Sequence, residues 1–395
     1  MTIGACLVLA GLFFLGERRA VGRNSKRIPL RIGVTGTRGK STVTRLIAAA
    51  LREAGYSVLA KTTGSRPALI FPDRRETEIK RRGPATILEQ AKILRLGVKL
   101  GVRAVVAELM SIQPECVFIE SRRILRPQVL VITNVRLDHR EEMGRTKREI
   151  AASLASAIPP RATVFIPEAE SYPEFDSAAE RAKATVIKVP AGGGQERISG
   201  DAPLRFFSFG EHIDLALAVA AHLGIPAEAA RRGMAEAKPD FGGLKVWEAL
   251  LGDPPVPWLL VSAFAANEPE STGVILERVR EWPAASGRPL VGILIFRSDR
   301  GDRTRQWVDA LDSGFFSGFE KVYLAGAHLQ AMEIRKRRKR MRFLETLPGR
   351  APNLIMERLA AAERGGGVLV GLGNMVGLGA ALVEHWERIG RPHAL

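Results

Sequence analysis

Short apolar runs recur along the chain, and many are followed by a stretch with helical spacing. The first six runs are residues 31–34, 57–60, 104–107, 129–132, 163–166 and 185–189. Their near-continuous hydrophobicity is typical of strands that are buried on both faces, and the helical spacers favour a parallel sheet. Three more runs, 258–261, 290–296 and 368–371, come after Gly- and Pro-rich stretches near 190–210 and 237–256. The pattern predicts an α/β protein with a doubly wound, mostly parallel sheet and a smaller C-terminal α/β domain.

The domain boundaries follow from the same pattern and from the first residues. Residues 1–16 carry no charge, and Arg18, Arg19 and further basic residues follow them. Sixteen helical residues reach about 24 Å, a short span against a hydrocarbon core of about 30 Å. Because the basic residues follow the apolar run, we expect a cytoplasmic chain held on the inner membrane face by an N-terminal anchor. A buried core helix is the alternative. We therefore predict an anchor at 1–20, a central domain at 28–245 and a C-terminal domain at 256–395.

Composition places the chain among globular proteins with an unusually basic surface. Of 395 residues 46% are hydrophobic and 26% charged, which is close to the average for soluble domains. Lys and Arg number 59 against 42 Asp and Glu, a net charge of +17, which favours a polyanionic partner. Nucleic acid, anionic lipid, nucleotide and acidic polymer are all compatible with this charge. The two cysteines exclude a disulfide framework, and the basic run 335–342 is either a solvated face or a docking patch.

The most informative segment is the strand, turn and helix around GTRGKST. Apolar residues from Val43 to Leu51 have the spacing of a helix that begins near Lys40. Glycines before that helix let backbone N–H groups face phosphate oxygens, Lys40 neutralises the phosphates, and Ser41 can ligate Mg²⁺. The spacing departs from the usual phosphate loop because Val34 stands where its first glycine is expected. We predict a nucleotide-binding loop at Gly36, Thr37, Arg38, Gly39, Lys40, Ser41 and Thr42.

Acidic side chains follow two of the predicted strands. Glu108 comes directly after the run 104–107, and Asp138 and His139 follow the run 129–132. Ligands of open parallel sheets collect at the carboxyl ends of strands. A buried Glu108 charge is costly without a cation beside it, so metal ligation is favoured over a capping or ion-pair role. For Asp138 and His139 the residues alone leave a helix cap and a site role equally open.

Ordered motifs along nearly the whole chain resemble a known family. GTRGKST, AELMS and TNVRLDH look like the Mur ligase superfamily of ATP-dependent amide ligases. The motifs IKRRGPATILEQ, FAANEPEST and RSDRGDRTRQ, together with the N-terminal apolar segment, are similar to the ligase subunit of poly-γ-glutamate synthase (PgsB/CapB). The resemblance implies that MgATP phosphorylates a substrate carboxylate and that the amine of glutamate attacks the acyl phosphate. The C-terminal domain is then expected to close over the nucleotide.

The resemblance also implies roles for individual residues. Lys40, Glu108 and His139 would be catalytic, with Ser41 and Glu108 on one Mg²⁺ and His139 on a second. Asn267 would contact ATP, and Asp299 and Arg300 would lie beside its phosphates. Partners would be glutamate, the poly-γ-glutamate chain, small integral-membrane subunits and the inner membrane surface. No nucleic-acid partner is expected, and a homo-oligomer is compatible with the sequence.

Some residues depart from the superfamily pattern. His212 starts a segment that lacks both asparagines of the usual motif, so it is either a packed helix residue or a ligand. Val376 stands where close relatives carry His. Two alternatives therefore stay open beside poly-γ-glutamate synthesis. One is a Mur-type or folylpolyglutamate-type ligase for a small acceptor, and the other is a basic phosphate-loop ATPase that binds nucleic acid.

Overall fold

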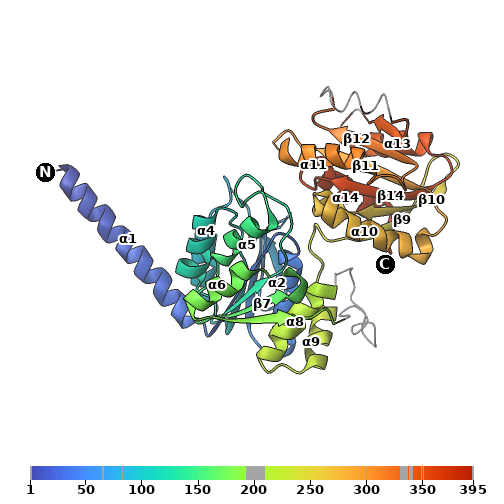
Figure 1. Ribbon diagram of the computed structural model, residues 1–395. Coiled ribbons are helices and arrows are strands. Elements are labelled where there is room, and N and C mark those ends of the chain that lie inside the picture. The colour runs from blue at the N-terminus through green and yellow to red at the C-terminus, as the bar shows by residue number, and fades with distance from the viewer. Residues whose placement is uncertain are drawn as a thin grey trace. The chain divides into compact units, whose positions relative to one another are not determined.

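The computed structural model divides into two compact units, Met1–Asp240 and Phe241–Leu395. It describes residues 2–64, 66–81, 83–192, 210–299, 301–329, 337, 341–347, 349 and 351–393. Each unit is a sheet covered by helices (Figure 1). The prediction of two α/β sheets, the second in a smaller C-terminal unit, is confirmed.

The first unit holds an eight-stranded sheet in the order β4-β3-β2-β5-β1-β6-β7-β8. Strands β2, β5, β1, β6, β7 and β8 are parallel, whereas β3 and β4 add antiparallel to the β2 side. Its strands are β1 (Leu30–Thr35), β2 (Val58–Thr62), β3 (Ala68–Ile70), β4 (Glu76–Glu78), β5 (Ala104–Glu108), β6 (Val129–Ile132), β7 (Thr163–Pro167) and β8 (Thr185–Val189). Its helices are α1 (Thr2–Arg27), α2 (Lys40–Glu53), α3 (Leu88–Lys99), α4 (Pro114–Phe118), η1 (Ile119–Leu125), α5 (Lys147–Ala155), η2 (Glu168–Glu170), α6 (Pro173–Ala182), α8 (Gly210–His222) and α9 (Ala227–Ala235).

Alternating side chains of the central strands build a core on each face of this sheet. Val129 and Val131 pack with the apolar residues of α2, α8 and α9. Leu130 and Ile132, which point the other way, pack with α3, α5 and α6. Because both faces are covered, the strands carry apolar residues at nearly every position. This is the physical basis of the continuous runs in the sequence.

The second unit holds a seven-stranded sheet in the order β13-β12-β11-β14-β10-β9-β15. Its strands are β9 (Lys245–Leu251), β10 (Val256–Ser262), β11 (Leu290–Phe296), β12 (Lys321–Gly326), β13 (Leu344–Thr346), β14 (Gly367–Gly373) and β15 (Arg391–His393). Its helices are η3 (Phe264–Ala266), α10 (Pro269–Glu281), η4 (Pro283–Ala285), α11 (Gly301–Asp312), α13 (Pro352–Ala362) and α14 (Leu378–Ile389). Residues 246–255, which the prediction left between its two domains, contribute most of β9, and β9 pairs antiparallel with β10 and β15.

The N-terminal helix is longer than the predicted anchor. α1 continues through the basic residues to Arg27, and its C-terminal part contacts α3 and η1. The apolar side chains from Val8 to Leu15 are exposed. Across the described residues, we find no helix with the length and apolar character needed to cross a membrane.

Most of the basic run 335–342 lies outside the described residues, and so does most of the Gly-rich stretch 190–210. Within the basic run, the Arg337 side chain donates from Nε to Asp312 Oδ2 over 2.9 Å. Whether the run is a docking patch stays a prediction.

Candidate nucleotide-binding site

The predicted phosphate loop joins β1 to α2 at the centre of the first sheet. Gly36 and Gly39 have φ angles of 126° and 77°, the left-handed region that glycine adopts without a steric penalty. A Cβ at Gly36 would lie 2.2 Å from Thr133 Oγ1, and one at Gly39 would lie 2.0 Å from His212 Nε2. Both positions therefore require glycine. The loop leads directly into the N-terminus of α2, where free backbone N–H groups favour an anion.

The loop is held by residues that follow the neighbouring strand β6. Thr37 donates from Oγ1 to Asn134 Oδ1 over 2.7 Å, and the Arg38 N–H donates to the same oxygen over 2.9 Å. Thr133 donates from Oγ1 to the Arg38 carbonyl over 2.5 Å. Arg136 donates its N–H to Thr37 Oγ1 over 2.8 Å. These bonds fix the backbone of the loop from a second strand end.

Lys40 folds back over this loop. Its Nζ donates to the Gly36 carbonyl over 2.7 Å and to the Thr37 carbonyl over 3.3 Å. Burial lowers the pKa of the ammonium, and the nearby Glu108 carboxylate opposes that shift. The cation therefore lies over the loop, where phosphate oxygens would replace carbonyl oxygens as its partners.

Ser41 and Glu108 meet at the start of α2. Ser41 donates from Oγ to Glu108 Oε2 over 2.7 Å, and the Thr63 N–H donates to the same oxygen over 2.6 Å. Glu108 is only 2% exposed, so its charge is withdrawn from water. The sequence places both residues at this point because β5 and β1 are adjacent and parallel, and their carboxyl ends share one edge.

A buried network positions the segment after Glu108. The Glu120 carboxylate in η1 accepts from the Ser111 N–H over 2.9 Å and from the Met110 N–H over 3.1 Å. Gln90 donates from Nε2 to the Glu108 carbonyl over 2.9 Å and to Glu120 Oε1 over 2.7 Å. This network fixes the backbone on which the Glu108 side chain stands.

The donor set around Ser41 suits a magnesium ion that phosphates complete. In the part of the chain that the structure describes, no cluster of three His, Cys, Asp or Glu side chains could hold a metal by itself. Mg²⁺ usually takes one or two protein oxygens and fills its octahedron with water and substrate phosphates. The Ser41 hydroxyl and the desolvated Glu108 carboxylate, 2.7 Å apart, fit that pattern.

Asp138 and His139 lie on the other side of the phosphate loop. Asp138 forms an ion pair with Arg38, with 3.0 Å between Oδ2 and Nη2. His139 has a left-handed φ of 50°, and its Nε2 lies 3.4 Å from Asp138 Oδ2. Asp138 thus links His139 to the loop through Arg38. The role of His139 as a metal ligand stays a prediction.

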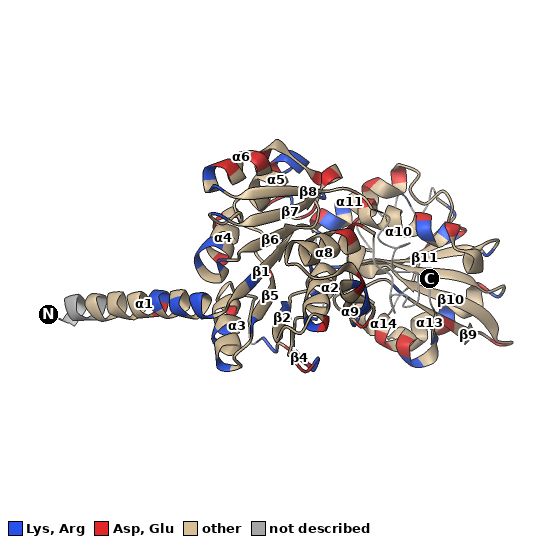
Figure 2. Cartoon of the chain, turned by 90° about the horizontal axis from the view of Figure 1, so that it is seen from below, with Lys and Arg blue, Asp and Glu red and all other residues tan. Residues whose placement is uncertain are grey.

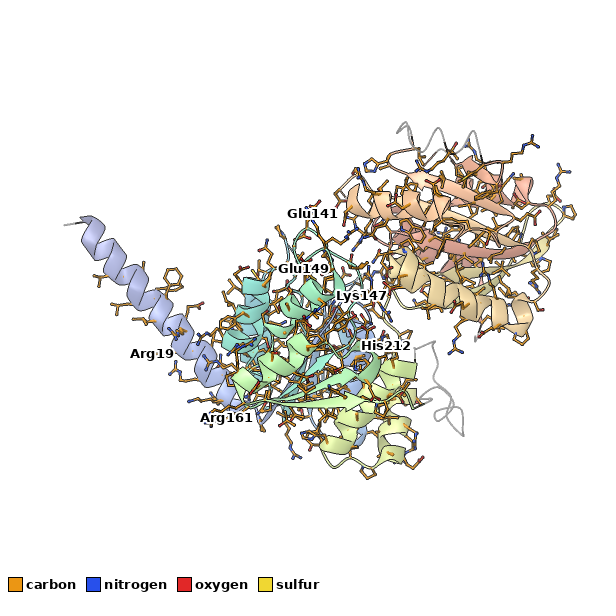
Figure 3. The ribbon with its side chains drawn as sticks, in the orientation of Figure 1. Arg19, Glu141, Lys147, Glu149, Arg161 and His212 are labelled. Atoms are coloured by element: carbon orange, nitrogen blue, oxygen red, sulfur yellow. The ribbon has the colours of Figure 1, made fainter. Side chains whose placement is uncertain are left out.

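His212 on α8 forms part of the wall of the loop. It is 4% exposed and is labelled in Figure 3. Its ring lies next to Gly39, because a Cβ at Gly39 would be 2.0 Å from His212 Nε2. Burial, assisted by the positive charge of Arg136, lowers the pKa of His212 to about 4. The imidazole is therefore neutral at pH 7 and packs against the turn.

The remaining predicted site residues belong to the second unit, at the carboxyl ends of β10 and β11. Asn267 has a φ of 64° and donates from Nδ2 to the Ala265 carbonyl over 3.0 Å. The backbone carbonyl of Asn267 accepts from Trp307 Nε1 over 3.1 Å. Asp299 accepts two hydrogen bonds from Arg297, at 2.9 Å and 2.6 Å. Arg300 lies outside the described residues.

Comparisons with known proteins identify the family of the chain. The Mur ligase middle domain matches residues 34–228, and the poly-gamma-glutamate synthase CapB C-terminal domain matches residues 252–389. The PGA synthase CapB of Bacillus subtilis (strain 168) is 35% identical over 315 residues, which are 78% of this chain and 78% of that protein. The chain belongs to the CapB family. The capsule biosynthesis protein CapB of Bacillus anthracis is 37% identical over 311 residues, 77% of this chain, and the match spans 65% of that relative's length.

Solved structures place the CapB-family fold among the Mur ligases. A Mycobacterium tuberculosis folylpolyglutamate synthase, crystallised with ADP and AMPPCP, has a TM-score of 0.66 at 20% identity and covers 100% of both chains. MurF from Acinetobacter baumannii has a TM-score of 0.64 at 17% identity, covering 93% of this chain and 79% of the other. At these identities the likeness shows the fold, and the predicted Mur ligase-like architecture is confirmed.

Sequence reasoning missed several residues that build this CapB-family site. Asn134 lies within TNVRLDH but received no role, although it accepts from both Thr37 and Arg38. Its position directly after an apolar run was the available signal. Gln90 ends the motif IKRRGPATILEQ but received no role. Glu120 gave no signal, because its partners become neighbours only in the folded chain.

Proposed function

We propose that this chain is an ATP-dependent amide ligase that extends poly-γ-glutamate. The observation that carries the proposal is the glycine-built loop at the N-terminus of α2, where Lys40 and the buried Ser41–Glu108 pair converge. The family membership supplies the substrate class, because the relatives are named for poly-γ-glutamate and capsule synthesis.

In the proposed reaction ATP lies with its phosphates on the loop. The backbone N–H groups of α2 and the Lys40 ammonium bind and orient the β- and γ-phosphates. Ser41 and Glu108 would hold Mg²⁺, which neutralises phosphate charge when it is bound. Transfer of the γ-phosphate to a carboxylate of the growing chain or of glutamate gives an acyl phosphate and ADP. The glutamate amine then attacks the acyl carbon, and phosphate leaves as the amide forms.

The residues around the loop would keep it rigid during this transfer. Asn134 fixes the backbone at Thr37 and Arg38, and the neutral His212 ring fills the space beside Gly39. Phosphoryl transfer depends mainly on positioning and charge neutralisation, so a rigid loop is the protein's main contribution. His139 would contribute to a second metal site, and Asn267, Asp299 and Arg300 would serve the nucleotide from the second unit.

We further propose that the protein acts at the inner membrane surface, together with small membrane subunits. The exposed apolar side chains of α1 between Val8 and Leu15, followed directly by basic residues, support this location. Such a segment lowers its free energy by leaving water for the interfacial region of a bilayer.

One preparation tests the ligase proposal. The full chain is incubated with ATP, Mg²⁺ and glutamate, and both ADP and γ-linked polymer are measured. Lys40→Ala should abolish ADP release while the circular dichroism spectrum is retained, and Lys92→Ala, an exposed lysine on α3, is the matched control. Retained ADP release in Lys40→Ala would remove the loop from the mechanism. Stimulation by DNA or RNA without amide product, or glutamate addition only to a folate or cell-wall precursor, would refute the polymer assignment.

A further inference from the structure

Five of the six parallel strands of the first sheet are preceded by a basic residue; β2 is the exception. Arg27 precedes β1, Arg103 precedes β5, Arg126 precedes β6, Arg161 precedes β7 and Lys183 precedes β8. The amino ends of parallel strands share one edge of a sheet. These five residues therefore form one row, which we call the amino edge. The phosphate loop stands at the opposite ends of the same strands, about 20 Å away at 3.3 Å per residue.

Three residues of this row have left-handed backbone conformations, which are energetically unfavourable for residues other than glycine and asparagine. The φ angles of Arg126, Arg161 and Lys183 are 51°, 60° and 51°. Glycine or asparagine adopts this left-handed region at lower cost than a long side chain. A basic residue close to a helix C-terminus gains from the helix dipole, which accounts in part for Arg126 and Lys183. Arg161 lies well beyond the end of α5 at Ala155, so this gain does not reach it.

The positive charge of the amino edge is largely uncompensated. Arg27, Arg103, Arg161 and Lys183 are exposed, and in the described chain none of them forms an ion pair. Arg103 stacks over the Tyr56 ring, with 4.8 Å from its Cζ to the centroid. Burial lowers the pKa of the neighbouring Arg31, and the positive charge of Arg126 lowers it further, as expected where like charges gather.

Few acidic side chains lie at this edge. Glu180, in the last turn of α6, is exposed there. Glu53, at the end of α2, forms an ion pair with Arg232 at 3.2 Å. The β3–β4 turn brings Arg74 and Arg75 to the edge, but these are matched by Glu236 and Asp73. The positive charge that acidic side chains do not balance therefore lies along the amino edge from β5 to β8.

The apolar segment of α1 leaves the first unit from this same edge. α1 ends at Arg27, just before β1, and a Cβ at Gly22 would lie 3.5 Å from Arg126 Nη1. Figure 2 shows basic segments along α1 and at the ends of α3 and α6 on the side where α1 joins the unit. Beyond the basic residues of α1 come its exposed apolar side chains, Val8, Leu9, Leu12, Phe13, Phe14 and Leu15.

We propose that the amino edge docks on the surface of an anionic lipid bilayer while the apolar segment of α1 enters its interfacial region. This rests on the proposed membrane association and adds to it a lipid-binding face on the folded unit. Arg103, Arg161 and Lys183 bind lipid phosphates, and the strands then direct the phosphate loop toward the aqueous side. An acidic polymer is the less suitable occupant, because polymer bound here lies at the far end of the strands from Lys40.

The charge and the apolar segment are expected to act together. A single apolar anchor gives reversible binding, and a basic patch converts it into stable attachment. A basic residue near an anionic surface strengthens binding about fivefold, so removal of two should weaken it by about 25-fold. The effect should vanish on neutral lipid and shrink at high salt.

The test uses the full chain and sedimentation with vesicles of phosphatidylcholine alone or with 30% phosphatidylglycerol. Arg161→Gly and Lys183→Gly are combined, because glycine suits the left-handed backbone at both positions. The matched control combines Arg278→Gln and Arg364→Gln, two exposed arginines of the second unit. We expect the first double variant to bind anionic vesicles about 25-fold more weakly. The control should bind like the unaltered chain, and both should keep glutamate-dependent ADP release in solution.

Three results would overturn the proposal. In one, the first double variant binds anionic vesicles as tightly as the unaltered chain, while deletion of residues 1–20 releases the protein. Membrane association would then depend on α1 and not on the amino edge. In another, both double variants weaken binding equally, so that only net charge matters. In the third, the edge variant loses binding to purified poly-γ-glutamate and keeps binding to lipid. Failure of the unaltered chain to bind either vesicle would refute membrane association itself, whereas ligase activity is read separately from ADP.

Discussion

The buried imidazole of His212 makes a sharp prediction about stability in acid. In the folded chain burial lowers its pKa to about 4, whereas an unfolded histidine titrates near 6.5. Below pH 6.5 the unfolded chain therefore takes up a proton that the folded unit does not, and the folded state loses stability as the pH falls toward 4. Between pH 7.5 and pH 5 this difference amounts to about 2 kcal/mol, with a limit of about 3.4 kcal/mol below pH 4.

The measurement has to report on the first unit. The five tryptophans, Trp247, Trp258, Trp282, Trp307 and Trp386, all lie in the second unit, so their fluorescence does not serve. Native-state hydrogen exchange of the slowest amides in β1 and α2 reports on the stability of the first unit, once protection factors are corrected for the intrinsic rate at each pH. We expect those protection factors to fall about 30-fold more between pH 7.5 and pH 5 in the unaltered chain than in His212→Gln.

The comparison of two chains isolates the imidazole. Burial raises the pKa of Glu170, which favours the folded state in acid, and this opposite contribution is common to both chains and cancels. An equal pH dependence in the unaltered chain and His212→Gln would show that the imidazole titrates alike in both states. The account of a neutral ring packed on Gly39 would then be wrong.

Two further predictions concern packing and the network behind Glu108. Gly371→Ala places a Cβ 2.3 Å from the Phe264 ring, so it should destabilise the second unit by about 1–3 kcal/mol, seen as a lower urea midpoint in tryptophan fluorescence. An unchanged midpoint would contradict that packing. Glu120→Gln replaces a buried acceptor of three N–H groups with a side chain that has one acceptor oxygen, and should cost about 1–3 kcal/mol in hydrogen-exchange stability of the first unit. It should also weaken Mg²⁺-dependent nucleotide binding by fluorescent-analogue titration, whereas Lys92→Ala should alter neither quantity.

The sequence predicted what depends on local pattern. The continuous apolar runs reflect strands covered on both faces, and all nine became strands. Gly36 and Gly39 could be placed because a turn before a helix has local sequence rules. By contrast, β3 and β4 have only three residues each, which is too short to give a pattern, and β4 is also polar. β9 was missed because the Gly and Pro residues beside it resembled a domain boundary.

The partners within the site were harder to foresee. Asn134 and Glu120 act through hydrogen bonds to residues distant in sequence, and such pairs become visible only when strand order is known. The adjacency of Ser41 and Glu108 was the exception, because both follow parallel strands and one geometric rule brings them together. Residues whose importance depends on side-chain packing, such as His212 beside Gly39, had no comparable rule.

The short strand β15 has a practical consequence for handling the protein. Arg391–His393 pairs antiparallel with Val246–Glu248 of β9 and covers the hydrogen-bonding edge of β9 there. A chain cut after Gly390 would leave the backbone N–H and C=O groups of β9 open to another strand, with Trp247 beside them. Unpaired sheet edges are templates for intermolecular pairing. An expression variant shortened at the C-terminus would thus be expected to aggregate, while a tag attached after Leu395 leaves the β15 pairing in place.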